Sequence, residues 1–147
     1  MDYKNLLNPV ALALEPSGIR KFFGIASTRK DCISLGVGEP DFPTPSVFTQ
    51  AGINSINAGK TQYTANAGLY ELRKAISKYT ARFIGVEYDP STEILITVGA
   101  SEGIDSSFRA VIAQGDEILI PEPCFVCYAP LVRLCGGIPV EIDCKIE

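Results

Sequence analysis

The sequence predicts an α/β layered fold in which short strands alternate with helices. Three short apolar runs at 94–98, 118–120 and 138–142 have the length of strands and end at Gly, Pro or acidic residues. Between them, residues 104–111 and 126–135 carry apolar side chains at helical spacing. This alternation predicts a parallel sheet with a right-handed βαβ connection, whose ligands bind at the carboxyl ends of the strands.

Composition limits the function classes. The 147 residues are 46% hydrophobic and 20% charged, which is typical of one globular core. A net charge of −4 without a basic run argues against nucleic acid or an acidic membrane surface as partner. No apolar stretch has the roughly 18 residues of a membrane span, and residues 1–5 do not resemble a signal peptide. We therefore expect a cytoplasmic protein.

Histidine is absent, so Ser-His and Cys-His nucleophile pairs are excluded. The five cysteines are expected to be reduced, mostly buried thiols: Cys32, Cys124, Cys127, Cys135 and Cys144. Cys124 and Cys127 form a C-x-x-C pattern without a second cysteine pair at zinc spacing, so no metal site is predicted.

The N-terminal third predicts a helix, a strand and a loop. A helix starts at Pro16-Ser17, and its core face carries Ile19, Phe22, Phe23 and Ala26. Residues 32–36 predict a strand, and residues 37–43 a loop, because Pro40 and Pro43 forbid a helix. Asp41 occupies the third glycine position of a dinucleotide fingerprint, so a nicotinamide site is rejected.

Two further helices follow. Thr44 is the predicted N-cap and Pro45 the first residue of a helix that ends at Gly59. Residues 61–68 are turn-rich. After them comes an amphipathic helix with apolar residues Leu69, Leu72, Ile76, Tyr79 and Phe83 and with solvated Arg73, Lys74 and Lys78.

The central stretch is 94–103. Residues 94–98 predict a strand buried on both faces, which stops at Gly99, and a helix pattern begins after two small residues. The N–H groups and the positive dipole of a helix start favour an anion such as phosphate there.

The C-terminal third continues the alternation. A turn at 115–117 leads into the strand 118–120, which ends at Pro121 and Pro123. A helix over 126–135 stops at Gly136-Gly137, and Pro139 places the strand 138–142 at an edge or at its own beginning.

Five ordered blocks resemble a known family. They are Ser17–Phe22, Ile33-Ser34-Leu35-x-x-Gly38-Glu39-Pro40-Asp41-Phe42-x-Thr44-Pro45, Tyr63-Thr64-x-Asn66-x-Gly68-x-x-Glu71-Leu72-Arg73, Gly99-Ala100-Ser101, and Gly115-Asp116-Glu117 followed by Pro121-x-Pro123. From about Leu6 to Ile142 the chain resembles the N-terminal part of class I/II pyridoxal-phosphate aminotransferases of fold type I.

The resemblance implies roles for six residues. Gly99, Ala100 and Ser101 match the loop that binds the cofactor phosphate, and Phe125 matches the aromatic residue that stacks on the pyridine ring. Gly38 matches the position whose backbone lies beside the substrate carboxylate. Tyr63 matches the tyrosine that reaches the cofactor phosphate of the neighbouring subunit, which implies a homodimer with shared sites. From the residues alone, Tyr63 is expected to pack, Tyr128 is expected to pack beside Phe125, and a plain core role stays open for Phe125.

The resemblance also implies an architecture. We expect a partial three-layer α/β/α sandwich of the large domain over residues 44–147, preceded at 1–43 by an arm, a helix and a substrate-side loop on the small-domain side. Transamination needs a lysine that holds the cofactor as a Schiff base, and none of the seven lysines here has the family's context. The chain is thus expected to be a fragment that is inactive alone and that associates or is poorly soluble.

Two function classes follow. The first is an enzyme that moves an amino group from an amino acid to a 2-oxo acid, with C–S lyase chemistry as a variant on the same fold. The second is a non-catalytic module that binds pyridoxal phosphate or a partner.

Overall fold

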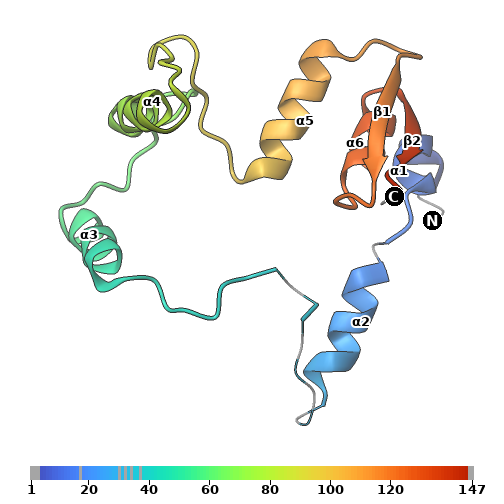
Figure 1. Ribbon diagram of the computed structural model, residues 1–147, viewed down its shortest axis with the longest axis horizontal. Coiled ribbons are helices and arrows are strands. Elements are labelled where there is room, and N and C mark those ends of the chain that lie inside the picture. The colour runs from blue at the N-terminus through green and yellow to red at the C-terminus, as the bar shows by residue number, and fades with distance from the viewer. Residues whose placement is uncertain are drawn as a thin grey trace. The chain divides into compact units, whose positions relative to one another are not determined.

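The computed structural model describes residues 4–16, 18–29, 31, 33, 35–36 and 38–145 (Figure 1). The chain divides into two units. The terminal unit consists of residues 1–38 and 100–147, and the middle unit of residues 39–99.

The terminal unit contains the only strands among the described residues. Its elements are η1 (Lys4–Leu6), α1 (Pro9–Ala13), α2 (Gly18–Ser27), α5 (Ala100–Val111), β1 (Glu117–Glu122), α6 (Tyr128–Leu134) and β2 (Ile138–Asp143). β1 and β2 pair in parallel, from Glu117 opposite Ile138 to Glu122 opposite Asp143. Because α6 connects them, β1, α6 and β2 form the βαβ unit that the C-terminal third predicts.

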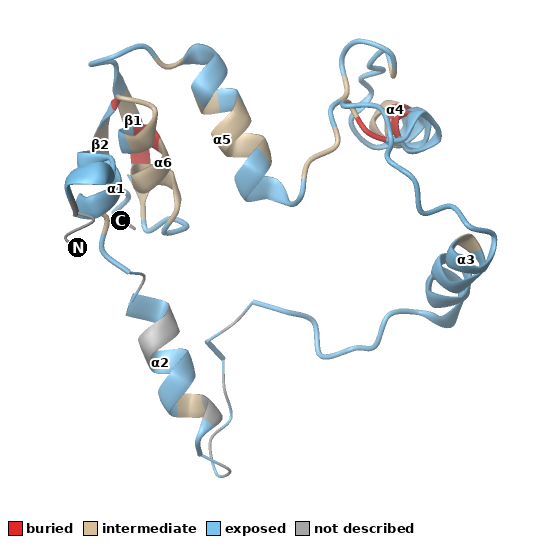
Figure 2. Ribbon diagram, turned by 180° about the vertical axis from the view of Figure 1, so that it is seen from behind, coloured by how far each residue is buried: buried red, intermediate tan, exposed pale blue. Residues whose placement is uncertain are grey.

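A small core lies between this sheet and α6. Ile120 is 4% exposed and Val132 is fully buried. Figure 2 shows buried segments in red where β1 and α6 meet. A Cβ on Gly137 would lie 2.9 Å from Cγ1 of Val132 and 2.9 Å from Cγ2 of Ile112. Glycine at this position therefore lets the start of β2 approach α6 closely. Pro139 lies at the second position of β2, as expected for the beginning of a strand.

The middle unit contains two helices, α3 (Ser46–Asn57) and α4 (Tyr70–Ile84). Both are predicted from their periodicity. The predicted cap of α3 is wrong by one residue: Pro45 takes the N-cap position without a side-chain hydrogen bond, and Thr44 lies outside the helix. At the other end α3 stops before Gly59, as predicted.

The burial of α4 differs from the prediction. Lys74 and Lys78 are exposed as expected, but Arg73 is 7% exposed and Ser77 is 5% exposed. The predicted apolar residues Leu69, Leu72, Tyr79 and Phe83 are exposed instead. The buried face is polar because both side chains donate hydrogen bonds to a later segment of the backbone.

The predicted central strand is absent from the described structure. Residues 94–97 have no regular secondary structure, and Val98 is 92% exposed. A strand requires ladder partners for its N–H and C=O groups. The described sheet contains β1 and β2, and Ile96 N donates instead to Ala67 O at 3.1 Å. The βαβ unit predicted from 94–98 through α5 to β1 therefore does not form.

Two predictions for the N-terminal third, the core face of α2 and the strand at residues 32–36, are not confirmed. α2 is a helix, but Ile19, Phe22 and Phe23 are exposed, so the predicted core face is not covered. Ser17, Cys32 and Ser34 lie outside the described residues, and Ile33 and Leu35 are not in a strand. In the described part of the chain, no helix is both long and apolar enough to cross a membrane.

Candidate functional site

The predicted phosphate turn is built from Gly99, Ala100 and Ser101. Gly99 has φ of +86°, a conformation that L side chains rarely adopt. Among the described residues, no atom outside its two chain neighbours lies within 4 Å of the place where its Cβ would stand. α5 begins directly after it at Ala100. The first N–H groups of a helix have no partner within the helix and carry the positive end of its dipole. A helix start directly after an open glycine turn is suited to binding an anion.

Thr97 contributes to this turn and is missed by the sequence reasoning. Its hydroxyl donates to Gly99 O at 3.0 Å and closes the backbone over three residues. Ser and Thr side chains bond nearby backbone in this way at turns, which is the signal that could have identified Thr97.

The segments that carry Tyr63 and Gly99 are joined within the middle unit. Besides the hydrogen bond from Ile96 to Ala67, Gly68 has φ of +91° and lies against the side chain of Ile96. Tyr63 itself is fully exposed. The structure thus ties the loop 61–69 to the segment that ends at Gly99, and it leaves the phenol of Tyr63 available to a ligand or a partner.

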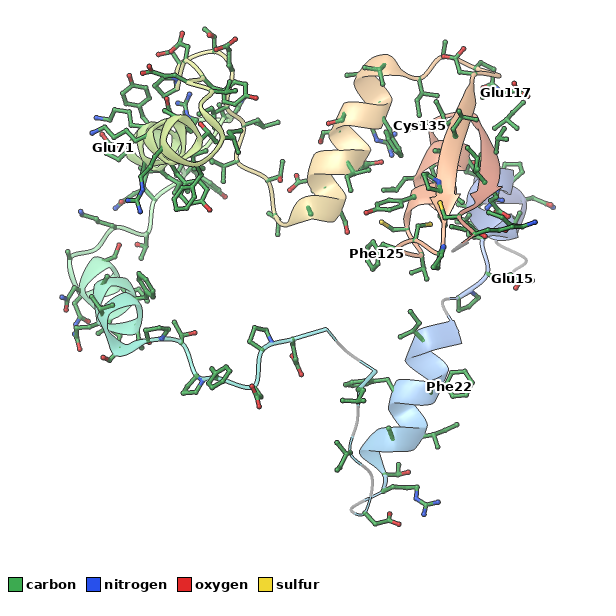
Figure 3. All side chains as sticks on the ribbon, in the orientation of Figure 1. Glu15, Phe22, Glu71, Glu117, Phe125 and Cys135 are labelled. Atoms are coloured by element: carbon green, nitrogen blue, oxygen red, sulfur yellow. The ribbon has the colours of Figure 1, made fainter. Side chains whose placement is uncertain are left out.

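Phe125 lies beyond the carboxyl end of β1, at the opposite end of the strand from Glu117 (Figure 3). Its side chain is exposed, and the ring of Tyr128 meets it edge-on, with centroids 6.0 Å apart and planes at 78°. Phe125 is 53% exposed. Its ring therefore offers an aromatic surface at the edge of the sheet where parallel sheets bind their ligands. Gly38, the predicted substrate-side position, is exposed, and the place where its Cβ would stand is open.

The four described cysteines are free thiols, as expected, but they are not buried. Cys124 and Cys144 are exposed, and Cys127 and Cys135 are half-buried. The pKa of the Cys124 thiol is raised, mainly by partial desolvation and to a smaller extent by the negative charges of Glu122 and Glu141. The described residues contain no cluster of metal-ligating side chains.

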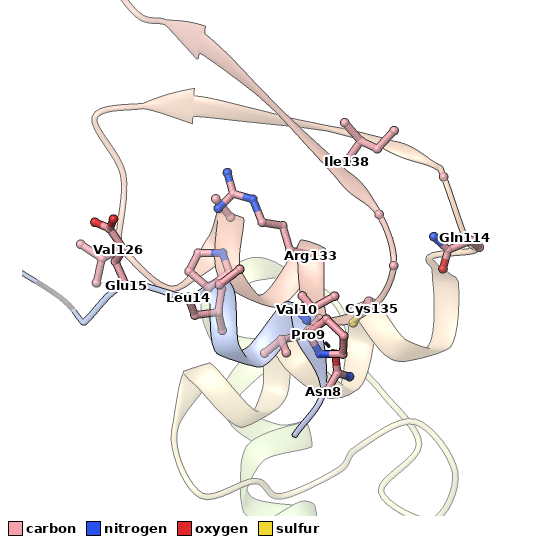
Figure 4. A pocket seen from close by; sticks show the side chains of 17 residues that line it. Asn8, Pro9, Val10, Leu14, Glu15, Gln114, Val126, Arg133, Cys135 and Ile138 are labelled. Carbon is pink, nitrogen blue, oxygen red and sulfur yellow. Dashed lines mark hydrogen bonds between the residues drawn. The ribbon is translucent and has the colours of Figure 1, made fainter. Parts of the chain in front are cut away.

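An open groove of about 1160 Å³ lies where α1 packs beside α6 and the start of β2 (Figure 4). Its lining mixes apolar side chains with the polar Asn8, Glu15, Gln114 and Arg133. None of the predicted cofactor residues lines it. The groove therefore does not include the predicted cofactor residues, and it results from the packing of α1 beside α6.

Comparison with known proteins identifies the family. The aminotransferase class I and II family matches residues 30–147. Over 129 residues the chain is 53% identical to the Bacillus subtilis protein YugH, which is named as an aminotransferase, and 46% identical to the aspartate aminotransferase of Pyrococcus abyssi. Both alignments cover 88% of this chain and 33% of the relative. The chain thus spans about a third of the length of these curated relatives.

Solved structures agree. The crystal structure described as Pyrococcus protein-A1 matches with a TM-score of 0.88 at 43% identity, covering 92% of this chain and 35% of that one. The aspartate aminotransferase of Thermus thermophilus with maleate matches with a TM-score of 0.86 at 33% identity, covering 93% and 37%. The predicted fold class, a partial α/β fold of the aspartate aminotransferase type, is confirmed. The chain belongs to the aminotransferase class I and II family.

Proposed function

We propose that this chain supplies the phosphate-binding part of an aminotransferase that moves an amino group from an amino acid to a 2-oxo acid. Pyridoxal phosphate is the cofactor of this family. The observation that carries the proposal is the turn at Gly99, open where a side chain would stand and followed at once by the start of α5. A dianionic phosphate fits such a turn because N–H donors and the helix dipole both favour negative charge.

The residues have distinct roles in this proposal. The N–H groups of Ala100 and Ser101 and the Ser101 hydroxyl hold the phosphate, and Thr97 fixes the turn before them. The face of Phe125 orients the pyridine ring and excludes water from one side of it. The bound cofactor supplies an electron sink for the bonds at the α-carbon of the amino acid.

Two further residues face the substrate and a second subunit. The backbone at Gly38 lies beside the substrate carboxylate, where the absence of a side chain permits close approach. Tyr63 reaches the cofactor phosphate of a neighbouring subunit, so the assembly is a cytoplasmic homodimer with shared sites. Residues 1–43 belong to the small-domain side and residues 44–147 to the first part of the large domain.

The substrate class is proposed from the relatives. Their names include aspartate, aromatic-amino-acid and N-acetyl-LL-diaminopimelate aminotransferases. An amino acid donor and a 2-oxo acid acceptor are common to this chemistry. None of the lysines of this chain is proposed to hold the cofactor covalently, so the chain alone is inactive.

A titration of the purified chain tests the proposal. We expect saturable binding of pyridoxal phosphate that is at least tenfold tighter than binding of pyridoxal, which lacks the phosphate. Ser101→Asp should abolish this preference by charge repulsion, and Ser107→Asp, in the middle of the same helix, should retain it. Equal binding of the two compounds by the wild type would contradict the phosphate site.

Borohydride reduction with peptide mass mapping tests the second part. We expect no lysine to be labelled stoichiometrically. Stoichiometric labelling of one lysine would make that residue the covalent partner and would overturn the proposed inactivity.

A further inference from the structure

The buried polar face of α4 holds a distant backbone segment. The guanidinium Nη1 of Arg73 donates to Pro90 O, and also to Ser91 O at 3.4 Å. One turn later in the helix, the hydroxyl of Ser77 donates to Tyr88 O at 2.6 Å. Two side chains on one helix face thereby hold three carbonyls within four residues, those of Tyr88, Pro90 and Ser91.

The fixed segment is a rigid turn in its own right. The Asp89 carboxylate accepts hydrogen bonds from Ser91 N at 2.8 Å and from the Thr92 hydroxyl at 2.9 Å. Glu93 N donates to Asp89 O at 2.9 Å. Because this turn has little freedom of its own, the orientation in which α4 holds it sets the direction in which residues 94–99 leave it.

The chain that follows the turn is held a second time, at Ile96. Ile96 bonds Ala67 and packs against Gly68, and Gly99 follows three residues later. The path into the phosphate turn is therefore fixed at two points. The first point depends on Arg73, whose side chain is buried and lies with its guanidinium carbon 5.3 Å from the centroid of the Tyr70 ring.

We propose that Arg73 is a positioning residue for the phosphate-binding turn at Gly99, acting through the segment 88–96. This inference rests on the proposed function. Arginine suits the task because its guanidinium is planar and permanently charged, and its Nη1 reaches both carbonyls from one rigid group. A lysine ammonium is a compact charge on a flexible stem, so we expect it to fix the segment less well.

Hydrogen exchange measured by mass spectrometry tests the anchor directly. In Arg73→Leu, we expect amide exchange in peptides that span 88–98 to accelerate at least tenfold. Lys74→Leu is the matched control, because Lys74 is the next residue of the helix, is exposed, and also lies over the Tyr70 ring, at 5.0 Å. Unchanged exchange in Arg73→Leu would overturn the proposal.

Binding of pyridoxal phosphate and of pyridoxal tests the link to the site. Arg73→Leu should weaken binding of pyridoxal phosphate about tenfold and leave binding of pyridoxal unchanged, and Arg73→Lys should recover part of the loss. Equal weakening of both compounds would show a structural role alone and would overturn positioning. If Arg73→Leu does not fold, Arg73→Lys and Ser77→Ala decide between the same outcomes.

Failure of the proposed function would look different. In that case the wild type itself would not prefer pyridoxal phosphate to pyridoxal. The exchange data would still show whether Arg73 fixes residues 88–98, and the positioning of a phosphate site would be overturned with the function.

Discussion

A Cβ placed on Gly68 would lie 2.5 Å from both Cβ and Cγ1 of Ile96. Gly68 also has φ of +91°, so a side chain there meets both steric overlap and backbone strain. We predict that Gly68→Ala destabilises the chain by about 2–5 kcal/mol, from about 1–2 for the backbone and about 1–3 for overpacking.

Gly59→Ala is the matched control in urea unfolding. Gly59 has φ of +69° but no atom within 4 Å of its Cβ position, so only the backbone cost of about 1–2 kcal/mol applies. Equal losses for the two variants would show that the contact with Ile96 contributes nothing.

The hydroxyl of Ser77 is expected to contribute to stability through Tyr88. Ser77→Ala removes the donor of a 2.6 Å hydrogen bond and leaves the Tyr88 carbonyl without it, which costs about 1–3 kcal/mol. The control is Ser107→Ala, because the Ser107 hydroxyl donates to Gly103 O within its own helix, and alanine is a better helix former. A loss in Ser107→Ala as large as that in Ser77→Ala would contradict the role of the 77–88 contact.

The Asp89 turn predicts a pH dependence. Hydrogen bonds from Ser91 N and then from the Thr92 hydroxyl lower the pKa of Asp89 below its ordinary value of 3.8. A carboxylate with a lowered folded-state pKa stabilises the fold above its unfolded pKa, and this contribution disappears as the pH falls through the folded-state value. Stability from Asp89 is therefore complete at neutral pH and is lost below about pH 4.

Asp89→Asn tests the sign. The difference between the urea midpoints of the wild type and the variant should be smaller at pH 3 than at pH 7, since the variant has no carboxylate to protonate. A difference that stays constant between these pH values would show that the charge of Asp89 has no part in the turn.

The sequence predicts those elements whose cause is local. α3, α4 and α5 follow from helical periodicity and β1 and β2 from short apolar runs, and all five are present. The burial of Arg73 is not predictable in this way, because its acceptors lie 17 and 18 residues later. The prediction of a strand at residues 94–98 is wrong for the same reason. An apolar run becomes a strand only where a neighbouring strand supplies hydrogen-bond partners for its backbone.

In the candidate site, too, features with a local sequence pattern are predictable and features that join distant segments are not. A small-residue turn before a helix is a local pattern, and the positive φ of Gly99 agrees with it. The roles of Tyr63, Gly38 and Phe125 came from the family resemblance and remain predictions. The anchor of the turn by Arg73 needed the structure, because it joins segments that a sequence pattern treats as independent.

Phe125 is predicted to act on the cofactor ring and not on its phosphate. Phe125→Leu should weaken binding of pyridoxal phosphate and of pyridoxal by the same factor, about two- to tenfold, which corresponds to the roughly 0.5–1.5 kcal/mol of an aromatic pair. Phe125→Trp should restore both affinities.

Tyr128→Phe is the control and should leave both affinities unchanged, because the edge contact with Phe125 needs the ring and not the hydroxyl. This pattern differs from that of Ser101 and Arg73 variants, in which only the phosphorylated compound is affected. Wild-type affinities in Phe125→Leu would assign Phe125 to packing against Tyr128 alone.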